Sequence, residues 1–172
     1  LMVVIGMIGF MAVFAYLYLY GINPEVWSAP PPLGETAIIV GIEAAALLAA
    51  WGGRRFLASK EGRLAEDLPW MLEALAATLL VGALYLDVTG WLATGLEPTA
   101  NGMGATVFML SVLQGQVVVV AVIMATYLAF REARGIMTTP TNVTMDIVAR
   151  FIMFCALQGM VFTFLPRVFP GV

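Results

Sequence analysis

The sequence predicts an all-α integral membrane protein, a single bundle of five transmembrane helices over residues 1–172. Hydrophobic residues make up 62% of the chain and charged residues only 11%, whereas a soluble domain carries about 25% charged residues. Five apolar runs are each long enough to cross a bilayer, because about 20 residues of α-helix span a hydrocarbon core of about 30 Å. Most of the surface is therefore expected to face lipid.

The apolar runs and the segments between them define the expected helices in order. We expect spans at about 2–21, 36–53, 70–94, 104–130 and 147–165. No basic residue precedes the first run, which favours a membrane span over a signal peptide. Prolines follow the first span, a basic segment follows the second, and turns with glycine and proline follow the third and fourth, so the helices end there. Tryptophans near the span ends are expected to anchor them in the interface: Trp27, Trp51, Trp70 and Trp91.

Basic residues predict which ends of the spans face the cytoplasm. Seven of the eight lie in the loops after the second and fourth spans or at the start of the fifth. The positive-inside rule then places the N-terminus inside and the C-terminus outside. Arg167, after the last expected span, is the one basic residue that disagrees. Five arginines on the predicted inner side are candidates for contacts with lipid headgroups: Arg54, Arg55, Arg63, Arg131 and Arg134.

Four polar side chains lie deep inside the expected spans. Burying a polar group there is costly, so each of them indicates a role in packing or in function. They come from four different spans and form one broad layer: Glu43, Asp87, Gln114 and Gln158. In one interpretation they hydrogen-bond across helices and set the packing, each contributing about 0.6–2 kcal/mol. In the other, the two carboxyls share a proton or hold a cation. We favour packing because no histidine, lysine or arginine is expected at the depth of the acids.

The sequence offers few groups for redox chemistry. It contains no histidine and a single cysteine, Cys155, inside an apolar run. Haem and copper centres are usually held by His and Cys, and Cys155 is expected to be a small buried apolar side chain. We therefore predict no catalytic, cofactor-binding or metal-binding residue here, and a non-catalytic subunit rather than an enzyme by itself. No basic cluster is large enough to suggest a nucleic-acid partner.

Three segments, taken in order, resemble a known family. An aromatic stretch over 14–20 leads into a loop with Trp27 and several prolines, a basic turn covers 53–66, and 102–108 reads Gly-Met-Gly-Ala-Thr-Val-Phe. They resemble three features of subunit III of the haem–copper (cytochrome c) oxidases. These features are the aromatic third helix with its Trp-Pro-Pro loop, the basic loop after the fourth helix, and the Tyr-Gly-Ser-Thr-Phe-Phe start of the sixth. The whole chain thus resembles the last five helices of that subunit, and its predicted direction agrees.

The chain departs from the family at three motifs. Gln114-Gly115-Gln116-Val117 stands where the family has His-Gly-x-His, and Asp87-Val88-Thr89-Gly90 stands where it has Gln-x-x-Glu. Ile147-Val148-Ala149 replaces the Trp-His-Phe that opens the last helix. Roles of individual family residues are therefore not carried over to these positions.

The resemblance implies an accessory subunit of a respiratory oxidase in a bacterial cytoplasmic membrane. In that family subunit III holds no redox centre, and haem and copper lie in the catalytic subunit I against which it packs. It binds phospholipid and supports assembly, proton uptake and the stability of the proton-pumping subunit during aerobic electron transport. Two alternatives remain open. One is a small transporter or channel that acts through Glu43, Asp87 and Gln114, and the other is a structural subunit of another membrane electron-transfer complex.

Overall fold

A computed structural model describes residues 2–23, 32–59, 64–99, 101–134 and 141–168. This part of the chain is all-helical, with helices α1 (Met2–Ile22), α2 (Leu33–Ser59), α3 (Leu64–Ala93), α4 (Gly102–Ala133) and α5 (Thr141–Val168). All five helices are long and apolar enough to cross a membrane. The predicted class, a polytopic α-helical membrane protein, is confirmed, while the direction of the termini stays a prediction.

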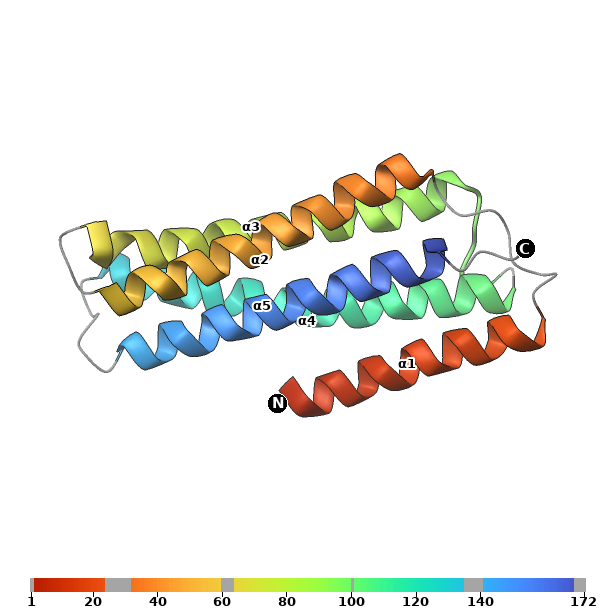
Figure 1. Ribbon diagram of the computed structural model, residues 1–172, viewed down its shortest axis with the longest axis horizontal. Helices are drawn as coiled ribbons and strands as arrows, with labels where there is room; N and C mark the ends of the chain where they lie inside the picture. The colour runs from red at the N-terminus through yellow and green to blue at the C-terminus, as the bar shows by residue number, and fades with distance from the viewer. Residues whose placement is uncertain (1, 24–31, 60–63, 100, 135–140, 169–172) are drawn as a thin grey trace.

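Helices α2 to α5 form a long bundle, and α1 lies against its side (Figure 1). Helices α2 to α5 run side by side, each antiparallel to the next in sequence, and α2 and α3 make the most extensive contact. Helix α1 packs on α4 and α5 and runs beside only part of their length. Below, the end of the bundle where α3 and α5 finish is called the Arg167 end, and the end where they start is called the Asp146 end.

The helices extend beyond the apolar runs that predicted them. Helix α2 continues six residues past its expected end at 53, and α5 continues three residues past its expected end at 165. Hydropathy marks only the part of a helix that lies in hydrocarbon, whereas the backbone hydrogen bonds continue into polar sequence. Helix α4 starts with an N-cap, because Asn101 Oδ1 accepts a hydrogen bond of 2.8 Å from the Gly104 backbone N–H. The longer α5 brings Arg167 into the bundle.

Small residues allow the close contact between α2 and α3. Ala46 and Ala50 of α2 and Ala76 of α3 are fully buried. At Gly53, an added Cβ would lie only 3.0 Å from the Pro69 carbonyl oxygen, so the backbones nearly touch there. Membrane helices pack in this way because close backbone approach increases van der Waals contact where no hydrophobic driving force exists.

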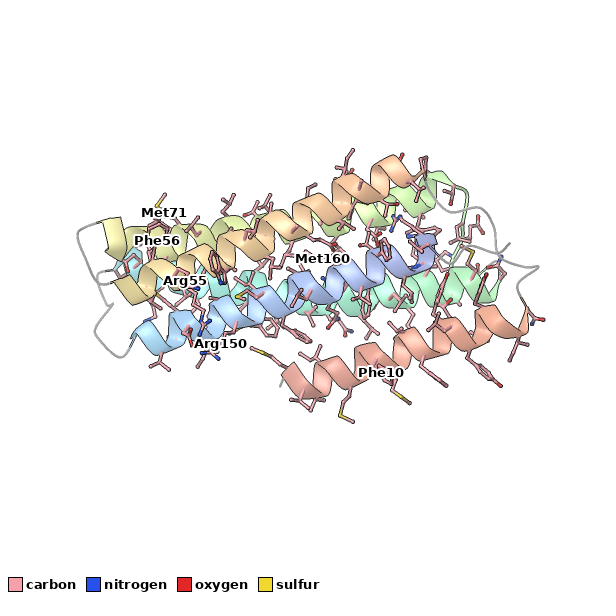
Figure 2. All side chains as sticks on the ribbon, viewed as in Figure 1. Phe10, Arg55, Phe56, Met71, Arg150 and Met160 are labelled. Carbon is pink, nitrogen blue, oxygen red and sulfur yellow. The ribbon has the colours of Figure 1, made fainter. Side chains whose placement is uncertain are left out.

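Helix α1 has the most exposed surface of the five. Gly9, Ala12 and Tyr16 are its buried residues, whereas Val4, Phe10 and Phe14 are more than half exposed. Figure 2 shows the side chains along α1 with Phe10 labelled, and Phe10 is 69% exposed. An apolar outer face of this kind suits lipid or another membrane subunit, because neither offers water to the side chains.

Candidate functional site

A buried ion pair joins α3 to α5 near the Arg167 end. Arg167 Nη1 donates to Asp87 Oδ1 over 2.5 Å, and the Arg167 side chain is fully buried. The same nitrogen also donates to the Thr163 carbonyl oxygen over 3.0 Å, and Ser111 Oγ of α4 donates to Asp87 Oδ2 over 3.3 Å. The guanidinium lies 4.9 Å from the ring centre of Trp91, a cation–π distance. Asp87 is thus paired and hydrogen-bonded, as a buried charge requires, whereas Arg167 Nε and Nη2 are buried without a hydrogen-bond partner among the described residues.

Beside this ion pair, Glu43 of α2 and Gln114 of α4 both approach α5 at Gly159. Glu43 is 3% exposed, and its Oε1 accepts a 3.5 Å hydrogen bond from Thr163 Oγ1. Gln114 Nε2 donates to the Cys155 carbonyl oxygen over 2.9 Å. Glu43 Oε2 and Gln114 Oε1 are buried and have no hydrogen-bond partner within the described ranges. Three of the four predicted polar residues, Glu43, Asp87 and Gln114, therefore contribute to one buried cluster.

Gly159 makes room for this arrangement. A Cβ added there would collide with Glu43 Oε1 and would lie 2.8 Å from Gln114 Nε2. The side chains of α2 and α4 can reach the α5 backbone only because position 159 carries none. Gly159, Thr163 and Arg167 are spaced by four residues, so they form one stripe on α5 that faces the polar groups.

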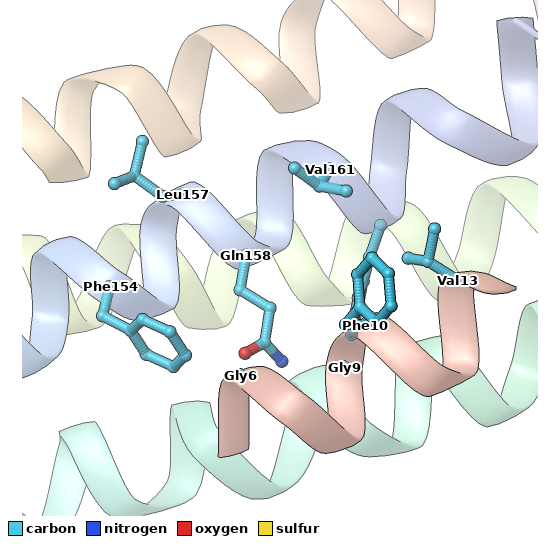
Figure 3. Close-up of a pocket in the computed structure, with 9 residues that line it drawn as sticks. Gly6, Gly9, Phe10, Val13, Phe154, Leu157, Gln158 and Val161 are labelled. Atoms are coloured by element: carbon cyan, nitrogen blue, oxygen red, sulfur yellow. The ribbon is translucent and has the colours of Figure 1, made fainter. Parts of the chain in front are cut away.

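Gln158, the fourth predicted member of the layer, faces α1 instead (Figure 3). Its Cδ lies 3.7 Å from the position that a Cβ on Gly9 would occupy. It is the polar residue of an otherwise apolar pocket of about 290 Å³ between α1 and α5, which includes Gly6, Phe10 and Phe154. The four-residue layer stays a prediction of depth, and the side chain of Gln158 lies on the α1-facing side of α5, away from the cluster of Glu43, Asp87 and Gln114.

The Asp146 end carries a second set of charged groups. Asp146 accepts from Arg54 Nε of α2 over 2.5 Å and from Arg150 Nε over 2.8 Å, and all three side chains are partly exposed. Glu73 of α3 is 1% exposed. Neither of its oxygens has a hydrogen-bond partner among the residues that the structure describes, and the same holds for the buried Trp70 Nε1.

The other arginines proposed for headgroup contact stack on aromatic rings. Arg55 lies 4.8 Å from the centre of the Trp51 ring, and Arg134 lies 4.2 Å from that of Phe130. Arg131 lies 5.6 Å from the Tyr127 ring centre. Such stacking keeps the cationic group near the helix surface, and headgroup contact stays a prediction for these side chains. Arg63 and Trp27 lie outside the described residues.

Sequence reasoning missed three buried residues. The expectation that no arginine lies at the depth of the acids is wrong, because Arg167 pairs with Asp87. Trp91, expected as an interfacial anchor, is 1% exposed inside the bundle. Glu73 was overlooked because it lies only three residues from the expected start of its span. The four-residue spacing of Gly159, Thr163 and Arg167 was the available signal, since it marks a polar stripe that continues past the apolar run.

Family models, curated proteins and solved structures were compared with the chain, and none of them matches.

Proposed function

We propose that the chain is an accessory, non-redox subunit of a respiratory haem–copper (cytochrome c) oxidase, similar to subunit III. The observation that carries this proposal is the pairing of Asp87 with Arg167, which gives the Asp87 carboxylate a counter-ion inside the bundle. The cluster contains three further hydrogen bonds. Ser111 donates to Asp87, Thr163 donates to Glu43, and Gln114 donates to the α5 backbone. Such a cluster fixes the packing of α2, α3, α4 and α5, which is what an accessory subunit contributes.

The remaining parts of the proposal follow from the surface and from the family resemblance. The exposed apolar face of α1 is suited to contact with lipid or with the catalytic subunit, which would hold the haem and copper. Arg54, Arg55, Arg63, Arg131 and Arg134 would meet phospholipid headgroups on the cytoplasmic side of a bacterial membrane. This placement assumes the N-terminus inside and the C-terminus outside, as the basic residues predict.

Purification in a mild detergent tests this function. We expect a tagged chain to carry with it a haem-containing subunit, detected by haem absorbance and by mass spectrometry of its partners. The control is a tagged, unrelated membrane protein of similar size from the same cells. A chain that purifies without any haem protein, although it remains folded, would contradict the proposal.

A second candidate function, cation or proton transport by this chain, is favoured by one observation. Glu43 Oε2 and Gln114 Oε1 are buried acceptors without a partner in the described structure, and buried polar atoms without partners often mark functional sites. A bound cation or a proton would satisfy them. The carboxyl of Glu43 is essential in this function and dispensable in a packing function.

Glu43→Gln separates the two functions. The amide keeps an oxygen that accepts the Thr163 hydrogen bond, so a packing role predicts unchanged yield of the complex and unchanged oxidase turnover. Glu97→Gln, at an exposed carboxyl, is the matched control. Normal yield with turnover abolished, or loss of ion flux into liposomes that contain the chain, would instead support transport.

A further inference from the structure

We propose that Glu73 is a proton-binding site that exchanges protons with the aqueous phase at the Asp146 end of the bundle. Glu73 is 1% exposed, and neither of its carboxyl oxygens has a hydrogen-bond partner among the described residues. A buried carboxylate is tolerated when a cation or several hydrogen bonds compensate for lost hydration. Glu73 has neither in the described structure, so a bound proton is the compensation that its geometry admits.

The neighbouring charges favour the neutral form of Glu73. Gly53 of α2 lies against Pro69 of α3, and the next residue, Arg54, binds Asp146 of α5, so Asp146 and Glu73 lie at the same end of the bundle. Arg54 on α2 and Arg150 on α5 both form ion pairs with Asp146, at 2.5 Å and 2.8 Å. The guanidinium groups of Arg54 and Arg150 are therefore engaged with the competing carboxylate, and that of Arg55 stacks on Trp51.

Helix α4 presents apolar residues to Glu73. Counting fourteen residues along each antiparallel helix from the Asp87–Ser111 hydrogen bond pairs Glu73 with Ala125, which is buried. The nearest charged residues of α4 in that direction are Arg131 and Glu132, which lie about 9–11 Å farther along the helix axis at 1.5 Å per residue. No charged side chain of α4 lies at the level of Glu73 within the described ranges.

Asp146 connects this buried group to the outside of the bundle. Its side chain is 32% exposed, and that of Arg54 is 40% exposed, whereas Glu73 is enclosed. When Glu73 releases its proton, the O–H bond breaks, the electron pair stays on the carboxylate, and the proton passes to water beside Asp146. Glu73 and Asp146 then both carry a negative charge at this end of the bundle. The proton thus links pH to the packing of this end, and the packing loosens as the pH rises.

Infrared spectroscopy of the full chain in lipid tests the site. Glu73→Gln preserves size and hydrogen-bonding capacity and removes the ionisable group. We expect the carbonyl band of a protonated carboxyl in the wild-type protein at neutral pH, with a component that is lost in Glu73→Gln and kept in Glu97→Gln. The difference between wild type and Glu73→Gln separates this component from any band of Glu43 or Asp87. Identical spectra for wild type and Glu73→Gln would overturn the proposal.

A second variant keeps the proposal testable if Glu73→Gln does not fold. Asp146→Asn removes the repelling carboxylate and releases Arg54 and Arg150, so Glu73 should lose its proton at lower pH and its band should disappear earlier in a titration. We also expect the unfolding temperature of the wild type to fall with rising pH more steeply than that of Glu73→Gln. A band that titrates identically in Asp146→Asn and wild type would overturn the assignment.

Discussion

Replacement of Arg167 by methionine is expected to lower the free energy of unfolding by about 3–5 kcal/mol, the usual cost of leaving one partner of a buried ion pair alone. The substitution keeps an unbranched apolar stem, removes the guanidinium, and leaves Asp87 with only the Ser111 hydroxyl as a hydrogen-bond donor among its described contacts. It also removes the cation from the Trp91 ring. Thermal or denaturant unfolding in detergent, followed by circular dichroism, measures the loss.

Two variants serve as controls for this experiment. Arg150→Met removes an arginine of the same kind from a half-exposed pair at the other end, and such pairs contribute about 0–1 kcal/mol. The double variant Asp87→Leu with Arg167→Met removes both charges and should recover most of the lost stability, because no unpaired charge remains. Equal effects of Arg167→Met and Arg150→Met would show that the Arg167 pair does not stabilise the bundle.

Gly159→Leu is expected to have the second largest effect. Any side chain at this position displaces Glu43 and Gln114, and the hydrogen bonds from Thr163 to Glu43 and from Gln114 to Cys155 are then lost. Leaving buried polar partners unsatisfied costs about 1–3 kcal/mol for each group, so a loss of about 2–6 kcal/mol follows. Yield of folded protein and the unfolding midpoint report the change.

Gly41→Leu is the matched control, since nothing lies within 4 Å of an added Cβ there. Leucine favours helix over glycine by about 0.8–1 kcal/mol, so this control should be neutral or slightly stabilising. Glu43→Ala combined with Gly159→Ala provides a further check, because truncating Glu43 removes one of the two clashes. If the loss of stability in this double variant equals the sum of the losses in the two single variants, Glu43 and Gly159 are not coupled.

The helices could be predicted from the sequence because each depends on local composition. An apolar run of sufficient length forms a helix in lipid whatever its neighbours are, since the backbone must satisfy its own hydrogen bonds there. All five spans were found, and the errors lie at the ends. At Arg167, for example, the helix continues after hydropathy falls.

The site was less predictable because it depends on how each helix is rotated and on its register. Glu43, Asp87 and Gln114 were identified by depth alone, and depth is what sequence position gives. Gln158 has a suitable depth, but its side chain faces α1, and only the packing of α5 sets that rotation. Arg167 changes the expected behaviour of Asp87, because Asp87→Asn, harmless to a simple packing group, would leave the guanidinium without its counter-ion.

The pairing of Asp87 with Arg167 also has a consequence for biosynthesis. The two residues are separated by 80 positions in the chain, and a ribosome that adds about 5–20 residues per second takes roughly 4–16 s to make that stretch. During this interval α3 has left the ribosome with an acidic side chain whose counter-charge has not yet been made. Insertion of an aspartate at the centre of a span costs about 2.5–3.5 kcal/mol, and the cost for Asp87 is smaller because it lies six residues before the end of α3 at Ala93. Helix α3 is thus expected to stay next to the insertion machinery until α5 arrives and supplies the counter-charge.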